Sequence, residues 1–232
     1  GISRRWNMQK AWDWSRDGGM EKIWKLLGSY GGEFLKGLGG TLYLAAATVA
    51  LGTALGILVA LLQMSRFRPA HALAQTYTEI LRGTPILLQL YFFWIGLPKL
   101  FPVALSDFAC ILIALVVNSS SYIAEIIRAG VGAVDAGQWE AARSVGLSEA
   151  HVLARVILPQ AVRNILPALG NQFIQMVKET SLGELMTSYK TVQAATFLAL
   201  QPLAIVGAIY FLMNVVLSRL VKRVERRLMV YG

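Results

Sequence analysis

Residues 40–62, GTLYLAAATVALGTALGILVALL, form an apolar stretch without a charged side chain. About 20 apolar helical residues cross a hydrocarbon core about 30 Å thick, so this stretch predicts a transmembrane helix. Within it, Thr48, Gly52 and Gly56 recur every four residues. Small residues at this spacing share one helical face, which lets a second helix backbone come close. The stretch therefore predicts a span with a packing face.

Four further segments predict spans of the same kind. One is interrupted: residues 70–81 and 86–97 flank Pro85, where proline is expected to kink the helix. The other three cover residues 108–127, 165–182 and 198–217. We therefore expect an all-α membrane protein with about five transmembrane helices. Its membrane domain covers residues 39–220, and residues 221–232 form a basic tail.

The composition indicates a membrane protein independently of the individual spans. Hydrophobic residues make up 56% of the chain and charged residues 15%, whereas soluble domains carry about 25% charged residues. The net charge of +9 comes from Lys and Arg near the ends of apolar segments. Anchoring on the cytoplasmic side explains this placement better than nucleic-acid binding does. The single Cys110 and two His have no metal-ligand spacing, so neither a disulfide nor a metal is expected.

Residues 1–38 form a polar arm in which Trp6, Trp12, Trp14 and Trp24 alternate with Lys and Arg. Indole rings and cations suit the membrane interface, so we expect an interfacial helix or an extended arm. A disordered tail stays open for the first twenty residues. The chain starts with Gly1 and not with Met, which indicates a trimmed start or a cloning remnant, and no cleavable signal peptide is expected.

The distribution of Lys and Arg predicts the orientation. One side collects Arg66, Arg68, Arg82, Arg128, Arg143, Arg155, Arg163, Arg219, Lys222, Arg223, Arg226 and Arg227, and the other side has Lys22, Lys25, Lys36, Lys99, Lys178 and Lys190. The first side is expected to be cytoplasmic. With five spans, the N-terminus then lies outside and the C-terminus in the cytoplasm.

Polar side chains form a stripe on each of two predicted spans. Residues 108–127 carry Asn118, Ser121, Tyr122 and Glu125, and residues 165–182 carry Asn171, Gln172, Gln175, Lys178 and Glu179. Their offsets place the members of each stripe on one helical face. Polar groups are costly in hydrocarbon, so such stripes mark a solute path or hydrogen bonds between helices. Both interpretations stay open here.

A polar loop between two apolar stretches contains Glu140-Ala141-Ala142, then Gly146 and Val156-Ile157-Leu158-Pro159. We expect a short helix that opens with the acidic residue, which suits the helix dipole. Gly146 permits a turn with φ > 0, after which a second helix folds back until Pro159 ends it. The same pattern also fits an ordinary surface hairpin of helices.

The loop resembles the EAA-x3-G-x9-I-x-L-P signature with which membrane subunits of bacterial ABC importers contact their ATPases, and Val156 is the one departure from it. Further motifs are similar to those of the polar amino acid uptake family of ABC permeases: Arg82-Gly83-Thr84-Pro85, Ser121-Tyr122-x2-Glu125-Ile126-Ile127-Arg128, Gly137-Gln138, Leu158-Pro159-Gln160-Ala161 and Lys178-Glu179-Thr180-Ser181-Leu182. Ser121 replaces the small apolar residue usual in that family. The resemblance covers residues 40–227.

The resemblance assigns roles to particular residues of this chain. The cytoplasmic coupling loop covers residues 137–159, and the residues expected to couple to the ATPase are Gln138, Glu140, Ala141, Ala142, Gly146, Leu158 and Pro159. The expected translocation path consists of Asn118, Ser121, Tyr122, Glu125, Asn171, Gln172 and Gln175. The gate candidates are Thr84, Pro85, Lys178, Glu179, Thr180 and Ser181.

The resemblance also implies partners in the bacterial inner membrane. The protein would be the permease subunit of an ATP-driven importer of polar amino acids, beside a second copy or a sister permease and with an extracytoplasmic binding protein that delivers the solute. ATP and Mg²⁺ would bind the partner ATPases, because this chain has no GxxxxGK[ST] phosphate loop and no catalytic set.

Two other functions are alternatives to an ABC permease: a secondary transporter and a membrane scaffold. A secondary transporter would use Glu125, Lys178 or Glu179 as a proton relay, but five spans without an inverted repeat argue against it. A membrane scaffold would only bind a partner through the loop and would show no solute-dependent activity.

Overall fold

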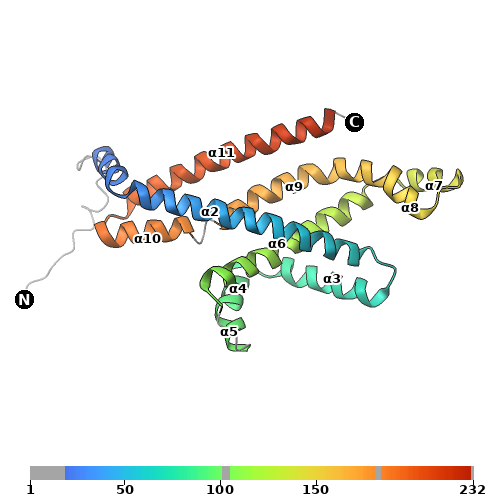
Figure 1. Ribbon diagram of the computed structural model, residues 1–232, viewed down its shortest axis with the longest axis horizontal. Helices are drawn as coiled ribbons and strands as arrows, with labels where there is room; N and C mark the ends of the chain where they lie inside the picture. The colour runs from blue at the N-terminus through green and yellow to red at the C-terminus, as the bar shows by residue number, and fades with distance from the viewer. Residues whose placement is uncertain (1–18, 101–104, 181–183, 231–232) are drawn as a thin grey trace, which may run out of the picture. The chain divides into compact units, whose positions relative to one another are not determined.

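The computed structural model describes residues 19–100, 105–180 and 184–230, which are helical apart from short connections (Figure 1). In chain order the elements are α2 (Gly19–Gln63), α3 (Arg68–Gly83), α4 (Ile86–Tyr91), the π-helical η1 (Phe92–Gly96), α5 (Leu97–Leu100), α6 (Asp107–Gly132), α7 (Ala136–Ser144), α8 (Glu149–His151), the π-helical η2 (Val152–Ile157), α9 (Leu158–Thr180), α10 (Glu184–Thr196) and α11 (Leu200–Val230). The fold is all-α, as the sequence predicts.

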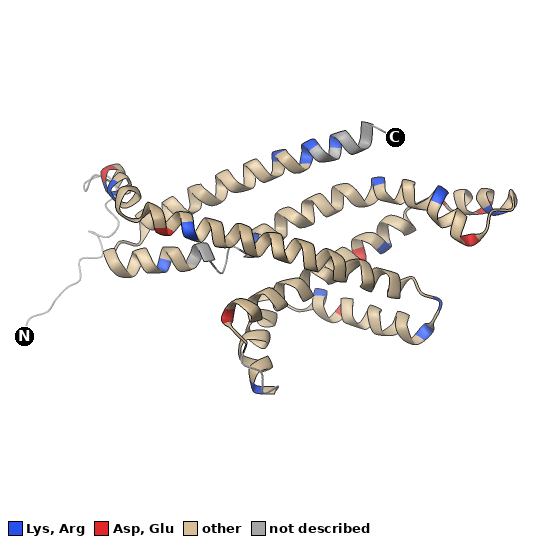
Figure 2. Ribbon diagram, in the orientation of Figure 1, with Lys and Arg blue, Asp and Glu red and all other residues tan. Residues whose placement is uncertain are grey.

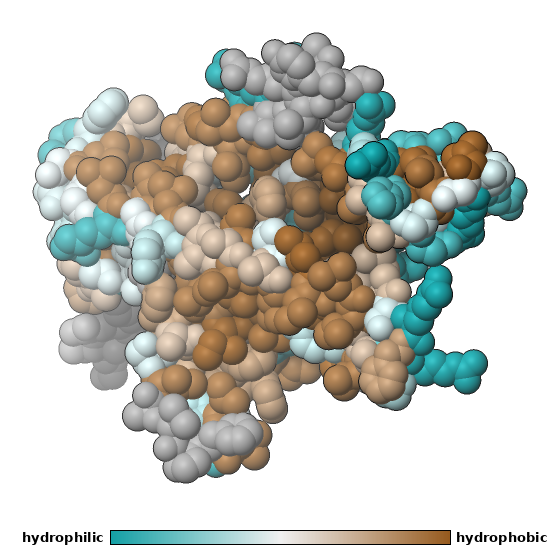
Figure 3. Space-filling model, turned by 45° about the vertical axis from the view of Figure 1, so that its right-hand side comes forward, coloured by the Kyte–Doolittle hydropathy of each residue, from teal (hydrophilic) through white to brown (hydrophobic). Residues whose placement is uncertain are grey.

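Among the described residues, four helical stretches are long and apolar enough to cross a membrane: α2, α6, Glu149–Thr180 and α11. A bent pair, α3 with the helical residues that begin at Ile86, makes a fifth if it is counted as one span. The part of α2 that follows Lys36 has no charged side chain and is uniformly tan in Figure 2. Apolar residues, brown in Figure 3, make up most of the visible face. This surface suits a lipid environment.

The chain divides into two compact units. The first contains the chain up to Thr41 together with residues 182–213, and the second contains residues 42–181 with residues from Asn214 onward. In the first unit, the expected arm from Gly19 onward is the beginning of α2, and Trp6, Trp12 and Trp14 lie outside the described residues. Its core is apolar: Leu26, Phe34, Val192, Ile205 and Val206.

In the second unit, the predicted small-residue face of α2 packs closely against α6. A Cβ added to Gly52 would lie 2.3 Å from Oγ of Ser119. A Cβ added to Gly56 would lie 2.7 Å from Cγ2 of Ile123 and 3.1 Å from the carbonyl oxygen of Ser120. These distances are shorter than van der Waals contact, so only glycine allows the two helices this approach. The structure confirms the packing face that the spacing predicts.

Alanine at Gly56 is therefore expected to destabilise the protein by about 1–3 kcal/mol, the usual cost of overpacking a well-packed contact. Gly39→Ala is the matched control, because it lies in the same helix and its added Cβ meets nothing within 4 Å. Alanine there is expected to leave stability unchanged or raise it by up to about 1 kcal/mol through helix propensity. Thermal unfolding in detergent measures both variants, and equal effects would contradict the close contact.

The predicted kink at Pro85 is a complete break. Helix α3 ends at Gly83, α4 begins at Ile86, and the two directions differ by 106°. The expectation of a kinked span is therefore corrected. Thr84 and Pro85 are both extended, with ψ of 142° and 137°. Proline disfavours the helical conformation in the residue before it, which accounts for Thr84. The break lies beside α6, against which both α3 and α4 pack (Figure 1).

Candidate functional site

The polar loop begins with a capped helix. Asp135 is the N-cap of α7, and its Oδ1 accepts a hydrogen bond of 2.7 Å from the backbone N–H of Gly137. Glu140 lies in the middle of α7 and is exposed. The expectation that Glu140 opens the helix is therefore wrong, because α7 begins at Ala136 and the side chain of Asp135 accepts from one of the free N–H groups of its first turn. The signal for this cap was an Asp directly before Ala136-Gly137.

Gly146 makes the predicted turn at the other end of α7. Its φ is +82°, the left-handed region in which a Cβ is unfavourable. Its N–H donates to the carbonyl oxygen of Arg143 at 2.9 Å, and the N–H of Leu147 donates to that of Ala142 at 3.3 Å. This pair of bonds is a Schellman motif, which satisfies the last carbonyls of the helix. The structure thus confirms the left-handed turn.

The second helix of the loop does not end at Pro159. Residues Glu149–Thr180 are continuously helical, through α8, the π-helical η2 and α9, and Pro159 is the second residue of α9. The expectation of a helix end there is wrong. Proline has no N–H to donate, so it is tolerated in a helix where the regular backbone hydrogen bonding is already interrupted. Just before Pro159 the helix changes from π-helical to α-helical hydrogen bonding, which is such an interruption.

The Arg143–Glu149 pair links α7 to the helix that follows. Nε and Nη2 of Arg143 donate to the two carboxylate oxygens of Glu149 at 2.8 and 3.1 Å. The hydrogen bond and charge of Glu149 raise the pKa of Arg143. The same guanidinium lies 5.5 Å from the centre of the Trp139 ring. Arg143 therefore braces the hairpin from outside, although both partners are exposed and the ion pair itself adds little stability.

The apolar side of the hairpin faces α9. Ala142 is buried and belongs to a cluster with Val134, Val152, Ile157, Ala161 and Ile165. The side chain of Gln160 also reaches Gln138, with Nε2 3.2 Å from its Oε1. The remaining predicted coupling residues, Gln138, Glu140, Ala141, Gly146, Leu158 and Pro159, are exposed. The loop thus has a packed inner face and an exposed outer face.

The hairpin is attached to two helices that pack against each other, α6 and α9. A Cβ added to Gly130 of α6 would lie 2.2 Å from Cγ1 of Ile165. Nδ2 of Asn164 also lies 3.4 Å from the carbonyl oxygen of Gly130. Figure 1 shows α7 and α8 beyond the ends of these two helices. The hairpin therefore connects the two helices that carry the polar stripes.

The stripe on α6 has a buried and a more accessible part. Asn118 and Ser121 are buried, and Oγ of Ser121 donates to the carbonyl oxygen of Asn118 at 2.7 Å. Tyr122 and Glu125 are half-buried. The spacing correctly placed these residues on one side of the helix, but packing separates them into an inner and an outer pair.

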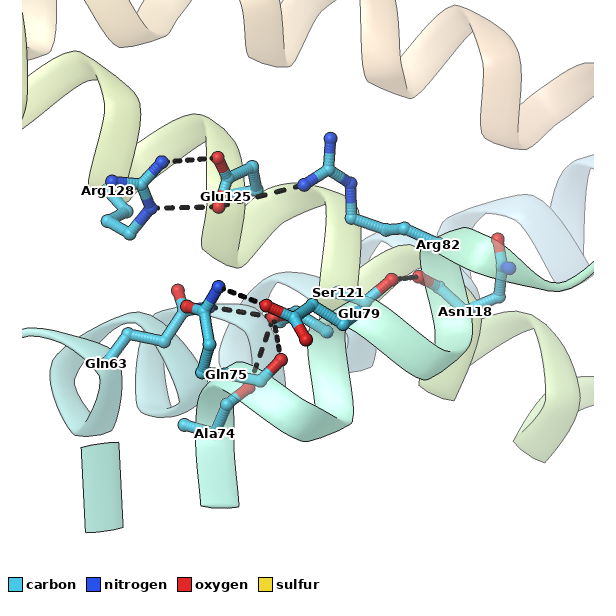
Figure 4. A network of polar contacts seen from close by, with 10 residues as sticks. Gln63, Ala74, Gln75, Glu79, Arg82, Asn118, Ser121, Glu125 and Arg128 are labelled. Carbon is cyan, nitrogen blue, oxygen red and sulfur yellow. Dashed lines mark hydrogen bonds and ion pairs between the residues drawn. The ribbon is translucent and has the colours of Figure 1, made fainter. Parts of the chain in front are cut away.

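Glu125 lies in a cluster of charged side chains (Figure 4). Its carboxylate accepts a hydrogen bond of 2.9 Å from Nε of Arg128, and Nη1 of Arg82 lies 3.7 Å from it. The Arg82 guanidinium also lies 5.7 Å from the centre of the Tyr122 ring. The end of α3 is thereby tied to α6. Two cations around one carboxylate give the cluster an excess positive charge, which suits an anionic group.

The stripe on α9 is more accessible. Asn171 and Gln175 are exposed and Gln172 is half-buried. Nε2 of Gln175 donates to Oε1 of Glu179 at 3.1 Å, one helical turn further along. Among the gate candidates here, Lys178 is exposed, Thr180 is buried and donates to the carbonyl oxygen of Val177, and Ser181 lies outside the described residues.

Comparison with known proteins places the chain in a family. Residues 52–230 match the family described as the binding-protein-dependent transport system inner membrane component. The chain belongs to this family. The chain is 40% identical over 200 residues to the arginine transport system permease protein ArtQ of Bacillus subtilis. That alignment covers 84% of this chain and 91% of the relative. The chain is also 33% identical over 196 residues to a putative glutamine transport system permease protein GlnP of Rickettsia bellii, with 82% and 90% covered.

Solved structures agree with this membership. The chain superposes with a TM-score of 0.83 on a chain from a crystal structure of an amino acid ABC transporter with histidines, at 42% identity and with 87% of this chain and 96% of that chain covered. It also shares the fold of a chain of the MetNI methionine ABC transporter, with a TM-score of 0.56 at 16% identity.

Three features of the structure were not predicted from the sequence: the Asp135 cap, the Arg143–Glu149 pair and the buried Gln89. Gln89 offered a signal, since it is the one amide in the apolar residues 86–97. The ion pair offered none, because its partners are six residues apart and belong to different helices.

Proposed function

We propose that this protein is the permease subunit of an ATP-driven bacterial importer of polar amino acids. The observation that carries the proposal is the braced hairpin of α7 and α8 at the end of two packed helices with polar stripes. Family membership and the similarity to arginine and glutamine transport system permeases support it. The proposed assembly holds two permease subunits, identical or sister chains, two ATPase subunits that bind ATP and Mg²⁺, and an extracytoplasmic binding protein.

The hairpin is the proposed contact with the ATPase. Its outer face presents Glu140 and Ala141, and Val145 at its tip is 76% exposed, an unusual position for a β-branched apolar side chain. Apolar and polar groups side by side are typical of protein interfaces. Because the inner face is packed against α9, a pull on the hairpin moves α6 and α9 with it. Closure of the ATPases would thus reorient the path.

The path is proposed to run along the polar stripes. The accessible members of the stripes are Tyr122, Glu125, Asn171, Gln172 and Gln175. Asn118 and Ser121 are buried. Amide, hydroxyl and charged groups together suit a zwitterionic solute, whose carboxylate and ammonium groups need an acceptor and donors. Thr84, Pro85, Lys178, Glu179, Thr180 and Ser181 remain the gate candidates.

We further propose that the N-terminus lies outside and the C-terminus in the cytoplasm. The exposed Arg219, Lys222, Arg223 and Arg226 in the last turns of α11, blue in Figure 2, support this orientation. In a Cys110→Ala background, an impermeant thiol reagent is expected to label Ser3→Cys in intact cells and Tyr231→Cys only after lysis. Labelling of Tyr231→Cys in intact cells would show the opposite orientation, in which the hairpin lies on the side of the membrane without ATP.

The function itself is tested with the purified protein. Co-purification is expected to recover an ATP-binding subunit, and in lipid vesicles the complex is expected to hydrolyse ATP faster when a binding protein and its amino acid are added. Arginine, glutamine, histidine and glutamate form the test panel. Uptake driven by an ion gradient without ATP would indicate a secondary transporter instead, and partner binding without any solute response would indicate a scaffold.

A further inference from the structure

The break between α3 and α4 leaves backbone groups without helical partners. The last carbonyls of α3 have no N–H group four residues ahead, because the chain turns by 106° after Gly83. Pro85 supplies no N–H either. Within a membrane an unsatisfied carbonyl costs several kcal/mol, so a break is tolerated only where another group takes the place of the missing donors.

The side chain of Gln89 takes that place. It projects from α4 and is buried, with 6% of its surface exposed. Its Nε2 lies 2.7 Å from the carbonyl oxygen of Leu81, 3.2 Å from that of Thr84 and 2.8 Å from Oγ1 of Thr84. Two amide hydrogens are thus shared among three acceptors at the end of α3. The hydroxyl of Thr84 donates a hydrogen bond of 2.9 Å to the carbonyl oxygen of Ile80.

Asn118 fixes the orientation of the Gln89 amide. Nδ2 of Asn118 donates to Oε1 of Gln89 at 3.0 Å, and Asn118 is 2% exposed. With Oε1 occupied as an acceptor, the NH₂ group of Gln89 must face the carbonyls of α3. Three helices are therefore linked in series: α6 through Asn118, α4 through Gln89, and the end of α3 through its carbonyl groups.

This link ends beside the charged cluster. Leu81, whose carbonyl Gln89 holds, directly precedes Arg82, and Arg82 contacts Tyr122 and Glu125 of α6. We propose that Gln89, oriented by Asn118, is a positioning residue that fixes the break between α3 and α4 and thereby holds Arg82 against Tyr122 and Glu125 in the solute path. The inference rests on the proposed function for the importance of the path, but the geometry of the break can be tested without it.

The first measurement is the geometry of the break. Spin labels at Leu73→Cys of α3 and Leu100→Cys of α5, both exposed, in a Cys110→Ala background, report the angle between the two segments as a distance. Gln89→Met keeps the volume and removes both hydrogen-bonding groups. We measure the distance between the two labels in the complex purified with its ATPase. In the Gln89→Met variant, the distribution of this distance is expected to shift or broaden relative to the labelled protein that keeps Gln89.

Gln75→Met is the matched control, because Gln75 lies on α3 and its side-chain amide donates at 2.7 Å to the exposed Glu79, its one side-chain partner within the described part of the chain. It is expected to leave the distribution unchanged. Gln89→Glu, nearly the same shape but without the NH₂ donors, is the second variant, and Asn118→Asp, which removes the donor to Oε1, is the third. An unchanged distribution in every one of these variants that reaches the membrane would overturn the proposal.

The second measurement asks whether Gln89 acts through Arg82. Gln89→Met is expected to lower uptake of labelled amino acid by about tenfold, the effect of leaving buried acceptors unsatisfied. In an Arg82→Leu background the same change is expected to have almost no further effect, because residues that act through one contact are not additive. Independent, additive losses would show a merely structural role and overturn the proposal. A shifted distance with normal uptake would support the role of Gln89 in fixing the break between α3 and α4. It would contradict the placement of Arg82, Tyr122 and Glu125 in the solute path.

Discussion

Valine at Gly146 is expected to reduce solute uptake by about tenfold or more while the protein still inserts into the membrane. The residue has φ +82°, where a side chain costs about 1–2 kcal/mol and a β-branched one more. A strain of about 1.4 kcal/mol corresponds to a tenfold change in an equilibrium. The strain is relieved when the Schellman turn opens, which displaces α7 from its position against α9.

Gly132→Val is the control for this prediction. Both glycines are exposed and an added Cβ meets nothing within 4 Å at either position, but only Gly146 has a positive φ. A loss at Gly146 with near-normal uptake at Gly132 therefore identifies the turn and not the lost glycine. Glu140→Lys adds a test of the exposed face, since it leaves the turn intact and reverses a charge where the ATPase would bind.

Three measurements distinguish docking from folding: the amount of the protein in the membrane, recovery of the ATPase on pull-down, and uptake of labelled amino acid. For Gly146→Val and Glu140→Lys we expect a normal amount, weaker ATPase recovery and lower uptake. Normal uptake by both variants contradicts the coupling role of the hairpin. If Gly146→Val is lost from the membrane, Glu140→Lys, which adds no backbone strain, still decides the question.

Leucine at Tyr122 or at Gln175 is expected to reduce uptake by about tenfold and to leave assembly with the ATPase unchanged. Each change removes a polar group from the proposed path, and a hydrogen bond between solute and protein is worth about 0.5–1.5 kcal/mol, or up to about 3 kcal/mol when a charged group takes part. Loss of Tyr122 also removes the ring over which the Arg82 guanidinium lies. The same change at Asn118 is expected to lower uptake too, through the displaced Gln89.

Tyr43→Leu and Gln75→Leu are the matched controls. Tyr43 is 68% exposed on α2 and stacks on Phe108, and the side-chain amide of Gln75 donates to Glu79 on its own helix. Neither side chain is part of a polar stripe. Both are expected to transport normally. If Tyr122→Leu, Gln175→Leu and Asn118→Leu all transport normally, the stripes serve helix packing and the path lies elsewhere.

Much of the fold could be predicted because a helix must be long and apolar to cross the hydrocarbon core of a bilayer. A length of about 20 apolar residues is sufficient to predict a span, and residues 40–62 meet it within α2. The packing face of Gly52 and Gly56 and the left-handed turn at Gly146 were predictable for a related reason: each depends on the absence of a Cβ, which the sequence states directly.

Tertiary structure decided what the polar residues contact. Periodicity places Asn118, Tyr122 and Glu125 on one face of α6, but it does not tell which neighbouring helix covers the face. Packing of α4 buries Asn118 against Gln89, and the end of α3 brings Arg82 to Glu125 over a separation of 43 positions. Contacts of this kind join helices that are remote in sequence, so their geometry follows from the assembled fold alone. The continuous helix through Pro159 has the same origin, since contacts of Val152 and Ile157 stabilise π-helical turns that local propensity does not favour.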